Sequence, residues 1–275
     1  MKYHLLFILL GSFFFSPAQA TTSQEFTQAE AMKLVLQHRY EANDHCGNWE
    51  LTDAEQKYFM KDVDGSPVES VWRVCPYQLH TFKQGSQERA YLLLQSNPAG
   101  PIMDCHICSP LMGSAIFEKQ ADGWKLLSQT RHLAFGLGTF GQAPPARFVK
   151  MGSERFGIWL ESSYSGMGTT TVDHILLAEV NGKLAEVWRA ATDGDNHGMV
   201  DIHPYYAYQS QLKFVPVKGQ LWPDLYQYVT GTAYREDDTR YASTGIKPVS
   251  VKETRVFKFD GQRYRGLKNY FKLHG

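Results

Sequence analysis

From about residue 63 to its end, the chain alternates short runs rich in Val, Ile, Thr, Tyr, Phe and Trp with Gly, Pro, Asn and Asp. This texture is typical of all-β proteins, because β-branched and aromatic residues favour strands and the other four favour turns. With 43% hydrophobic residues, the chain can bury a sizeable core. We predict a mainly β fold of many antiparallel hairpins, forming a sandwich, a barrel or an irregular propeller-like domain.

Three Asx-Gly pairs predict the positions of hairpin turns. Asp122-Gly123, Asn181-Gly182 and Asp260-Gly261 each separate two apolar runs. A two-residue primed turn needs positive φ angles, which Gly and Asx residues adopt at the lowest cost. Their unequal spacing does not define a sequence repeat. Further strands are expected over residues 90–95, 147–151, 156–162, 171–180, 211–217 and 225–232.

The first twenty residues have the pattern of a secretory signal peptide. Lys2 precedes an apolar run over residues 5–15, and the segment closes with Ala18-Gln19-Ala20. Small residues before the cut suit signal peptidase, so we predict cleavage after Ala20 and a periplasmic or secreted protein. The apolar run is shorter than the ~20 residues of a spanning helix, which disfavours the alternative of an uncleaved membrane anchor. No membrane span is expected after the leader is removed.

Two capping boxes predict helices after the leader. Thr27 and Glu30 have the spacing that begins a helix, expected over residues 27–40, and Thr52 and Glu55 repeat it for a shorter helix ending before Asp64. No low-complexity linker divides the chain. We therefore expect a helical segment over residues 21–62, packed on a β-rich domain over residues 63–275.

The charge balance limits the kinds of partner. The chain has 28 Lys and Arg against 28 Asp and Glu, with no basic run, so a nucleic-acid partner is not expected. The many Trp and Tyr residues suit contact with a protein or a carbohydrate ligand.

Four cysteines, Cys46, Cys75, Cys105 and Cys108, are expected to pair in an oxidising compartment. Three connectivities are open, and we favour Cys46 with Cys75 and Cys105 with Cys108. The Cys105-His106-Ile107-Cys108 run also fits a thiol-disulfide oxidoreductase, although Pro110 disfavours the helix that would lower a thiol pKa. A zinc site is a further alternative, with His80 or His132 as the additional ligand.

An acidic segment from Asp193 to Asp201 is the candidate metal site. Its pattern resembles the calcium-binding loops of exported proteins, in which alternate oxygen ligands surround the ion. The resemblance indicates Asp193, Asp195, His197 and Asp201 as ligands and calcium as the candidate cofactor. His197 departs from the pattern, since imidazole is a poor calcium ligand, and a solvated Asx-rich turn is the favoured alternative. A transition metal would instead favour His197 with His203.

Two other motifs are interpreted as turns. The glycine pattern from Gly136 to Gly141 precedes Pro144 and Pro145, so the helix required for a dinucleotide site is not expected. Ser165 lies near Asp173 and His174, but adjacent residues of a strand point to opposite faces, which disfavours a serine hydrolase.

No complete catalytic set emerges from the sequence. We therefore expect an exported, non-catalytic binding or interaction protein. The alternative is an extracytoplasmic enzyme, either a thiol-disulfide oxidoreductase that uses Cys105 and Cys108 or a metal-dependent hydrolase that uses the acidic segment.

Overall fold

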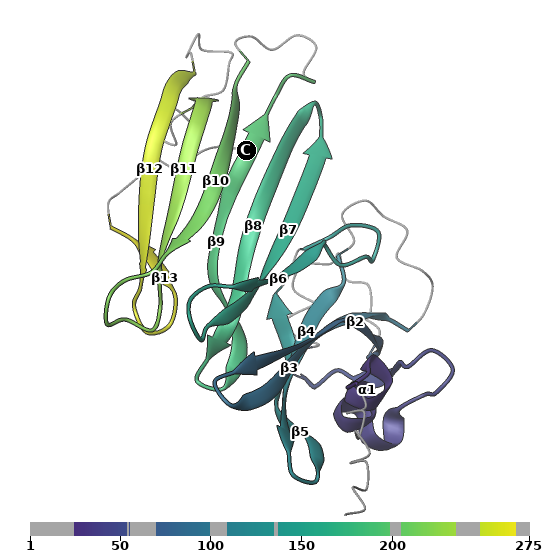
Figure 1. Cartoon of the computed structure of the whole chain (residues 1–275). Helices are drawn as coiled ribbons and strands as arrows, with labels where there is room; N and C mark the ends of the chain where they lie inside the picture. Colours follow the sequence, from purple (N-terminus) through teal and green to yellow (C-terminus); the bar gives the residue numbers. More distant parts are fainter. Residues whose placement is uncertain are drawn as a thin grey trace, which may run out of the picture.

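The computed structural model describes residues 25–53, 55, 70–99, 109–134, 137–198, 205–234 and 248–267. It contains one short N-terminal α-helix and two antiparallel sheets (Figure 1), which confirms the prediction of a mainly β fold. The predicted leader and the Cys105–Cys108 run lie outside the described residues. Among the residues described, no helix is long and apolar enough to cross a membrane.

Both sheets are meanders in which neighbouring strands follow one another along the chain. Sheet 1 contains β1 (Gly47–Glu50), β2 (Val71–Gln84), β3 (Gln87–Pro98), β4 (Leu111–Gln120) and β5 (Gly123–Ala134). Sheet 2 contains β6 (Ala146–Lys150), β7 (Phe156–Gly166), β8 (Thr169–Val180), β9 (Lys183–Asp195), β10 (Ala207–Val215), β11 (Asp224–Ala233), β12 (Val249–Phe259) and β13 (Tyr264–Gly266).

Only one of the three predicted Asx-Gly turns has the expected geometry. Asn181 and Gly182 have φ angles of 52° and 75° and join β8 to β9 as a two-residue primed turn. In the β4–β5 hairpin, Gln120 pairs with Gly123, so the turn residues are Ala121 and Asp122 and the predicted position is wrong. The turn at Asp260 is also wrong in type, because its carboxylate accepts the N–H groups of residues 262 and 263 and forms a longer loop.

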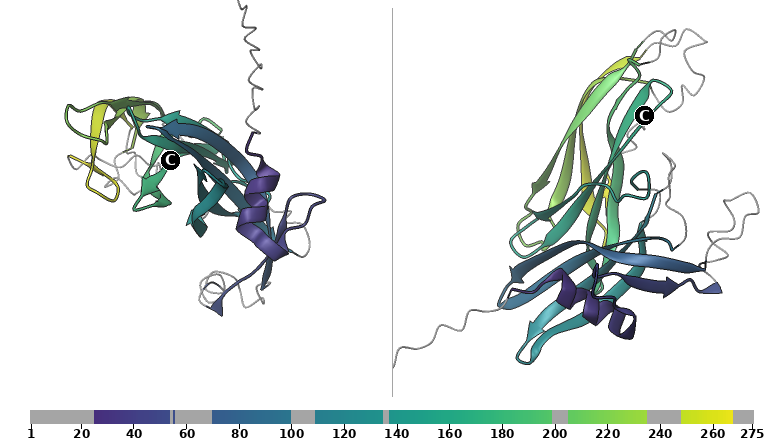
Figure 2. Two further views of the ribbon diagram at one scale, coloured as in Figure 1. Left: turned by 60° about the horizontal axis from the view of Figure 1, so that its bottom comes forward. Right: turned by 90° about the vertical axis from the view of Figure 1, so that its right-hand side faces the viewer.

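Sheet 1 wraps around the N-terminal helix α1 (Gln28–Leu36), which continues as the 3-10 turn η1 (Gln37–Arg39). The predicted capping box is present, since Thr27 accepts from the Glu30 N–H and Glu30 accepts from the Thr27 N–H. The helix packs on sheet 1 on the side away from sheet 2 (Figure 2). Its buried face contacts buried residues of β1 to β4, which are Trp49, Val74, Ala90, Leu92, Leu94, Ala115 and Phe117.

The two edge strands of sheet 1 are linked by one side chain. Arg131 of β5 donates to the Glu50 carbonyl of β1 at 2.6 Å, and its guanidinium lies 4.9 Å from the Trp49 ring centroid. The start of the second predicted helix lies beside this link. Thr52 and Glu55 form their reciprocal capping hydrogen bonds, and Glu55 also contacts His132.

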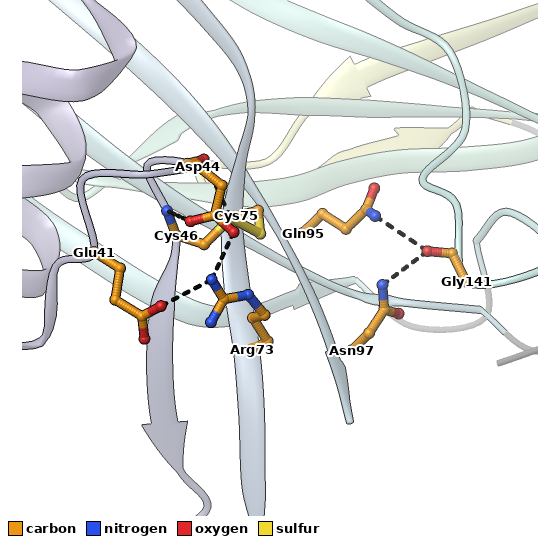
Figure 3. Close-up of a disulfide and its surroundings, with 8 residues drawn as sticks. All are labelled: Glu41, Asp44, Cys46, Arg73, Cys75, Gln95, Asn97 and Gly141. Carbon is orange, nitrogen blue, oxygen red and sulfur yellow. Dashed lines mark hydrogen bonds and ion pairs between the residues drawn. A yellow bond between two sulfur atoms is a disulfide. The ribbon is translucent and has the colours of Figure 1, made fainter. Parts of the chain in front are cut away.

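The disulfide between Cys46 and Cys75 joins the residue before β1 to β2, as the favoured pairing predicted. Figure 3 shows Arg73 beside this bond, where its guanidinium forms ion pairs with Glu41 at 3.0 Å and Asp44 at 2.6 Å. These contacts fix the chain between α1 and β1 against β2.

The glycine motif, in its described part, forms a tight turn between β5 and β6, as the sequence indicated. Gln95 and Asn97 of β3 each donate to the Gly141 carbonyl (Figure 3). Gly138 has a φ of 90°, and a Cβ there would lie 1.9 Å from the Gln142 carbonyl oxygen. Glycine is therefore needed here for the turn itself.

The other face of sheet 1 packs against β7 and β8 of sheet 2. Tyr91 and Leu93 belong to the same buried cluster as Ile158 and Ile175. A buried ion pair crosses this interface, because Arg89 donates to both carboxylate oxygens of Glu179, at 2.7 and 3.1 Å. Tyr91 also donates to Glu179 at 3.0 Å, so the Glu179 carboxylate is paired with both a guanidinium and a phenol between the sheets.

Sheet 2 curls along its width, so that β10 to β12 approach β7 to β9 from the side opposite sheet 1. Trp159 of β7 stacks with Phe214 of β10 at 5.7 Å, and Trp188 of β9 contacts Phe257 of β12 at 5.5 Å. Strands β9 and β10 pair through two residue pairs only. These pairs lie at the distal end of sheet 2, which carries the β7–β8 turn and is farthest from sheet 1 (Figure 1).

Candidate ligand-binding face

One face of sheet 2 is polar and exposed toward its distal end, and strand register defines its residues. Partners directly opposite in an antiparallel ladder share a face. Thr170 of β8, Asp195 of β9 and Ala207 of β10 follow one another across the sheet in this way. We call this surface the polar face; the same registers place on it Val172, Asp193, Gln209, Gln211, Tyr228, Thr230, Thr232, Ser250, Lys252 and Thr254.

A cavity of about 470 Å³ opens on the polar face. It lies across β8, β9, β10 and β11, and its lining includes two carboxylates, two threonine hydroxyls and one amide. The lining residues are Thr170, Val172, Asp193, Gly194, Asp195, Ala207, Tyr208, Gln209, Thr230 and Gly231. Such a lining is rich in hydrogen-bond donors and acceptors.

The opposite side of these strands is buried and combines an apolar cluster with the polar side chains Thr192, Gln227 and Arg255. Tyr206, Tyr208, Val229 and Val251 form one cluster there, and burial raises the pKa of Tyr208. The Tyr208 ring covers Gly194, where a Cβ would lie 2.9 Å from the ring. The floor of the cavity is therefore backed by packed aromatic side chains, which makes the site rigid.

Both aspartates of the cavity already accept backbone hydrogen bonds. Asp193 accepts from the Ser210 N–H at 3.3 Å, and Asp195 accepts from the His197 N–H at 3.2 Å. Asn196 is 3% exposed and accepts from the Tyr206 N–H at 2.7 Å. Each carboxylate retains acceptor capacity for a ligand, because an ionised carboxylate offers about four lone-pair sites.

The acidic segment differs in conformation from the predicted loop. Asp193 and Asp195 belong to strand β9, so the turn begins only at Asn196. His197 stacks on Tyr205 at 5.2 Å, and Asp201 and His203 lie outside the described residues. Over the part of the chain that the structure describes, no group of three or more His, Cys, Asp or Glu side chains could hold a metal ion. Calcium binding stays a prediction.

The serine, aspartate and histidine near the β7–β8 turn have separate partners. Ser165 contacts the Thr170 hydroxyl at 3.0 Å, whereas His174 contacts the Thr192 hydroxyl at 2.8 Å. Burial lowers the pKa of His174 and raises that of Asp173. These side chains do not form a hydrolase triad.

The two histidines considered for zinc lie in different surroundings. His80 of β2 stacks on Phe148 at 4.9 Å, and burial lowers its pKa. His132 contacts Glu55. Cys105, His106 and Cys108 lie outside the described residues, so the oxidoreductase and zinc alternatives stay hypotheses.

Sequence patterns did not identify Tyr226 and Tyr228 as candidate site residues, although both lie on β11 beside the cavity. Buried Leu225, Gln227 and Val229 alternate with them along the strand. Because the buried row includes the polar Gln227, this alternation is hidden in the sequence, and the pattern along the strand does not by itself identify the outward face.

No protein-family model, curated protein or solved structure matches this chain significantly. The geometry of the polar face therefore carries the functional argument.

Proposed function

We propose that the chain is an extracytoplasmic, non-catalytic binding protein that takes a carbohydrate in the cavity of the polar face. The Cys46–Cys75 disulfide fits a location outside the cytoplasm, because such bonds persist in oxidising compartments. The secretory pattern of residues 1–20 supports the same location.

The single observation that carries this proposal is the chemistry of the cavity lining. Sugar hydroxyls both donate and accept hydrogen bonds, so they complement Thr170 and Thr230 hydroxyls, the Gln209 amide and nearby carboxylates. A preformed hollow with convergent polar groups is a typical small-ligand site.

The arrangement of the carboxylates favours binding over hydrolysis. Asp193 and Asp195 lie two residues apart on one strand, so they approach a ligand from the same side. Glycoside hydrolases instead place two carboxyl groups on either side of the scissile bond. Among the described residues that line the cavity, no second carboxyl group faces Asp193 and Asp195 from the other side.

The test is saccharide titration of the purified full chain, followed by calorimetry and ligand-observed NMR. The probes are glucose, galactose, mannose, N-acetylglucosamine and their oligomers, at up to about 10 mM, which covers weak binding. We expect saturable binding that Asp195→Asn and Gln209→Ala weaken. Asp122→Asn, in the exposed β4–β5 turn, is the matched control.

Two outcomes would overturn the proposal. One is the absence of binding by every saccharide, and the other is binding that the cavity variants leave unchanged. Cleavage of a bound oligomer would overturn its non-catalytic part.

A further inference from the structure

Two tyrosines on the outward side of β11 extend the polar face beyond the cavity. Tyr226 and Tyr228 lie two residues apart on β11, with ring centroids 6.1 Å apart and planes at 30°. Tyr228 is 37% exposed, which is a large exposed fraction for an aromatic side chain in the middle of a sheet. It lies two residues from Thr230 of the cavity, so all three side chains share one side of the strand.

Packing in the protein interior does not account for the position of these rings. The buried side of β11 carries Leu225, Gln227 and Val229 instead. Across the ladder, Tyr228 faces Gln211 of β10 and Thr254 of β12, both exposed and polar. The pair thus forms a small aromatic strip whose partners across the ladder are polar, except for Val256 opposite Tyr226.

This combination suits the flat face of a sugar ring. A tyrosine offers an apolar ring face and a polar hydroxyl tip, so it can cover the C–H groups of a sugar while its neighbours bind the hydroxyls. Lys213, opposite Tyr226, and Lys252, opposite Thr230, balance the charge of the two cavity aspartates. Because these charges balance, the strip and the cavity together suit an uncharged ligand.

A peptide fits this strip less well than a saccharide. Peptides that add a strand need a free sheet edge, but β11 is hydrogen-bonded to β10 on one side and to β12 on the other. Helical peptides need a continuous apolar groove, whereas Tyr228 has polar partners on both sides and only Val256, opposite Tyr226, extends the apolar surface.

We infer that Tyr226 and Tyr228 form a second subsite, so that the ligand is an oligosaccharide chain lying along β11 from the cavity. This inference rests on the proposed function and names its ligand more closely. From Thr232 to Tyr226 the strand spans about 20 Å at ~3.4 Å per residue, which accommodates several successive sugar rings.

The experiment measures affinity against chain length in the full-length protein. The probes are N-acetylglucosamine oligomers and cello-oligosaccharides of increasing length. Wild-type affinity should rise with length, and Tyr228→Ala or Tyr226→Ala should lower the affinity for long chains by about 3- to 10-fold, as expected for one lost aromatic contact each. The affinity for the monosaccharides should stay unchanged.

Three variants serve as controls. Tyr228→Phe keeps the ring and should retain most of the length dependence. Tyr164→Ala removes a tyrosine that is 50% exposed near the β7–β8 turn, off the strip, and should change nothing. Melting curves of Tyr228→Ala and Tyr226→Ala verify folding.

The outcomes separate this inference from the proposed function. Monosaccharide binding with no gain from chain length, or a gain that survives both alanine substitutions, overturns the second subsite and leaves the cavity intact. Failure of all saccharides to bind overturns both. Binding of peptides in preference to saccharides, through the same tyrosines, also overturns both.

Discussion

Strands β3 and β11 come from meander sheets of the same topology, yet they have different side-chain patterns. In β3, Tyr91, Leu92, Leu93 and Leu94 are successive and all buried, because α1 covers one face of sheet 1 and sheet 2 covers the other. In β11, buried residues alternate with more exposed ones from Leu225 to Thr230. The number of covered faces therefore decides the pattern, and only the strand with one free face can offer a binding surface.

The two regions also differ in what holds them together. Sheet 1 is fixed by the Cys46–Cys75 disulfide and by Arg131 between its edge strands. Strands β10 to β12 depend on their backbone ladder and on the apolar cluster around Tyr208. We therefore expect substitutions on the doubly covered sheet to affect stability, and those on the polar face to affect binding.

The largest difference should come from removing one large side chain from each region. Phe117 of β4 is fully buried between α1 and sheet 1, where it contacts Phe26 at 5.2 Å. Phe117→Ala should lower the free energy of unfolding by about 3–5 kcal/mol, since it leaves a cavity. Tyr228→Ala should cost less than about 1 kcal/mol. Urea denaturation measures both, and equal losses would contradict the comparison.

Removal of the disulfide should have the next largest effect. Cys46 and Cys75 are separated by 29 residues, and the chain-entropy relation then gives about 3–4 kcal/mol at 25 °C. The double variant Cys46→Ser, Cys75→Ser should lose this stability, as denaturant unfolding would show. In this double variant, backbone amide hydrogen exchange should become faster in β1 and β2 than in wild type, with a smaller change in β11. Faster exchange in β11 alone would show that the disulfide does not act locally.

Local signals in the sequence predicted part of the local structure. The Thr27 capping box and the Asn181-Gly182 turn depend on neighbouring residues only, and both form as expected. Strand β2 was missed because Pro76 interrupts its pattern, and the structure accommodates this proline at an irregularity of the ladder between Pro76 and Gln78.

The candidate site was predicted only in part, for a physical reason. Asp193 and Asp195 were identified from their spacing in a pattern that resembles calcium-binding loops, but their place on strand β9 depends on pairing with β8. Tyr226 and Tyr228 were missed because a strand's exposed side is set by what the rest of the chain covers. That information is non-local, so a pattern read along one strand does not contain it.

A smaller, pH-dependent effect should appear at Glu55. Burial alone raises the pKa of this carboxyl, but hydrogen bonds from Thr52 and His132 outweigh burial, and the net pKa lies below the ordinary value for a glutamate. A lowered folded-state pKa gives stability that is present above the unfolded pKa and is lost as pH falls through the folded value. Wild-type protein should therefore lose more stability on acidification below pH 4.5 than Glu55→Gln does.

The measurement is unfolding free energy across that acidic range. Glu186→Gln, which removes an exposed pair with Arg189 at 2.7 Å, is the control and should follow the wild-type curve. If the unfolding free energies of Glu55→Gln and wild type change in parallel with pH, the ionised Glu55 carboxylate does not stabilise the fold.

The smallest effect should come from the polar face itself. Gln211→Ala and Thr254→Ala remove exposed side chains that face Tyr228, and each should change the free energy of unfolding by no more than about 0.5 kcal/mol. Val229→Ala, on the buried side of the same strand, should cost about 2 kcal/mol. Thermal and urea unfolding of the three variants provide the comparison.

This contrast tests why the polar face has its chemistry. If Gln211 and Thr254 contribute little to stability, folding alone does not require an amide and a hydroxyl beside an exposed tyrosine, as the proposed subsite expects. Losses as large as that of Val229→Ala would instead make the face a structural element, and the exposure of Tyr228 would then no longer argue for a ligand.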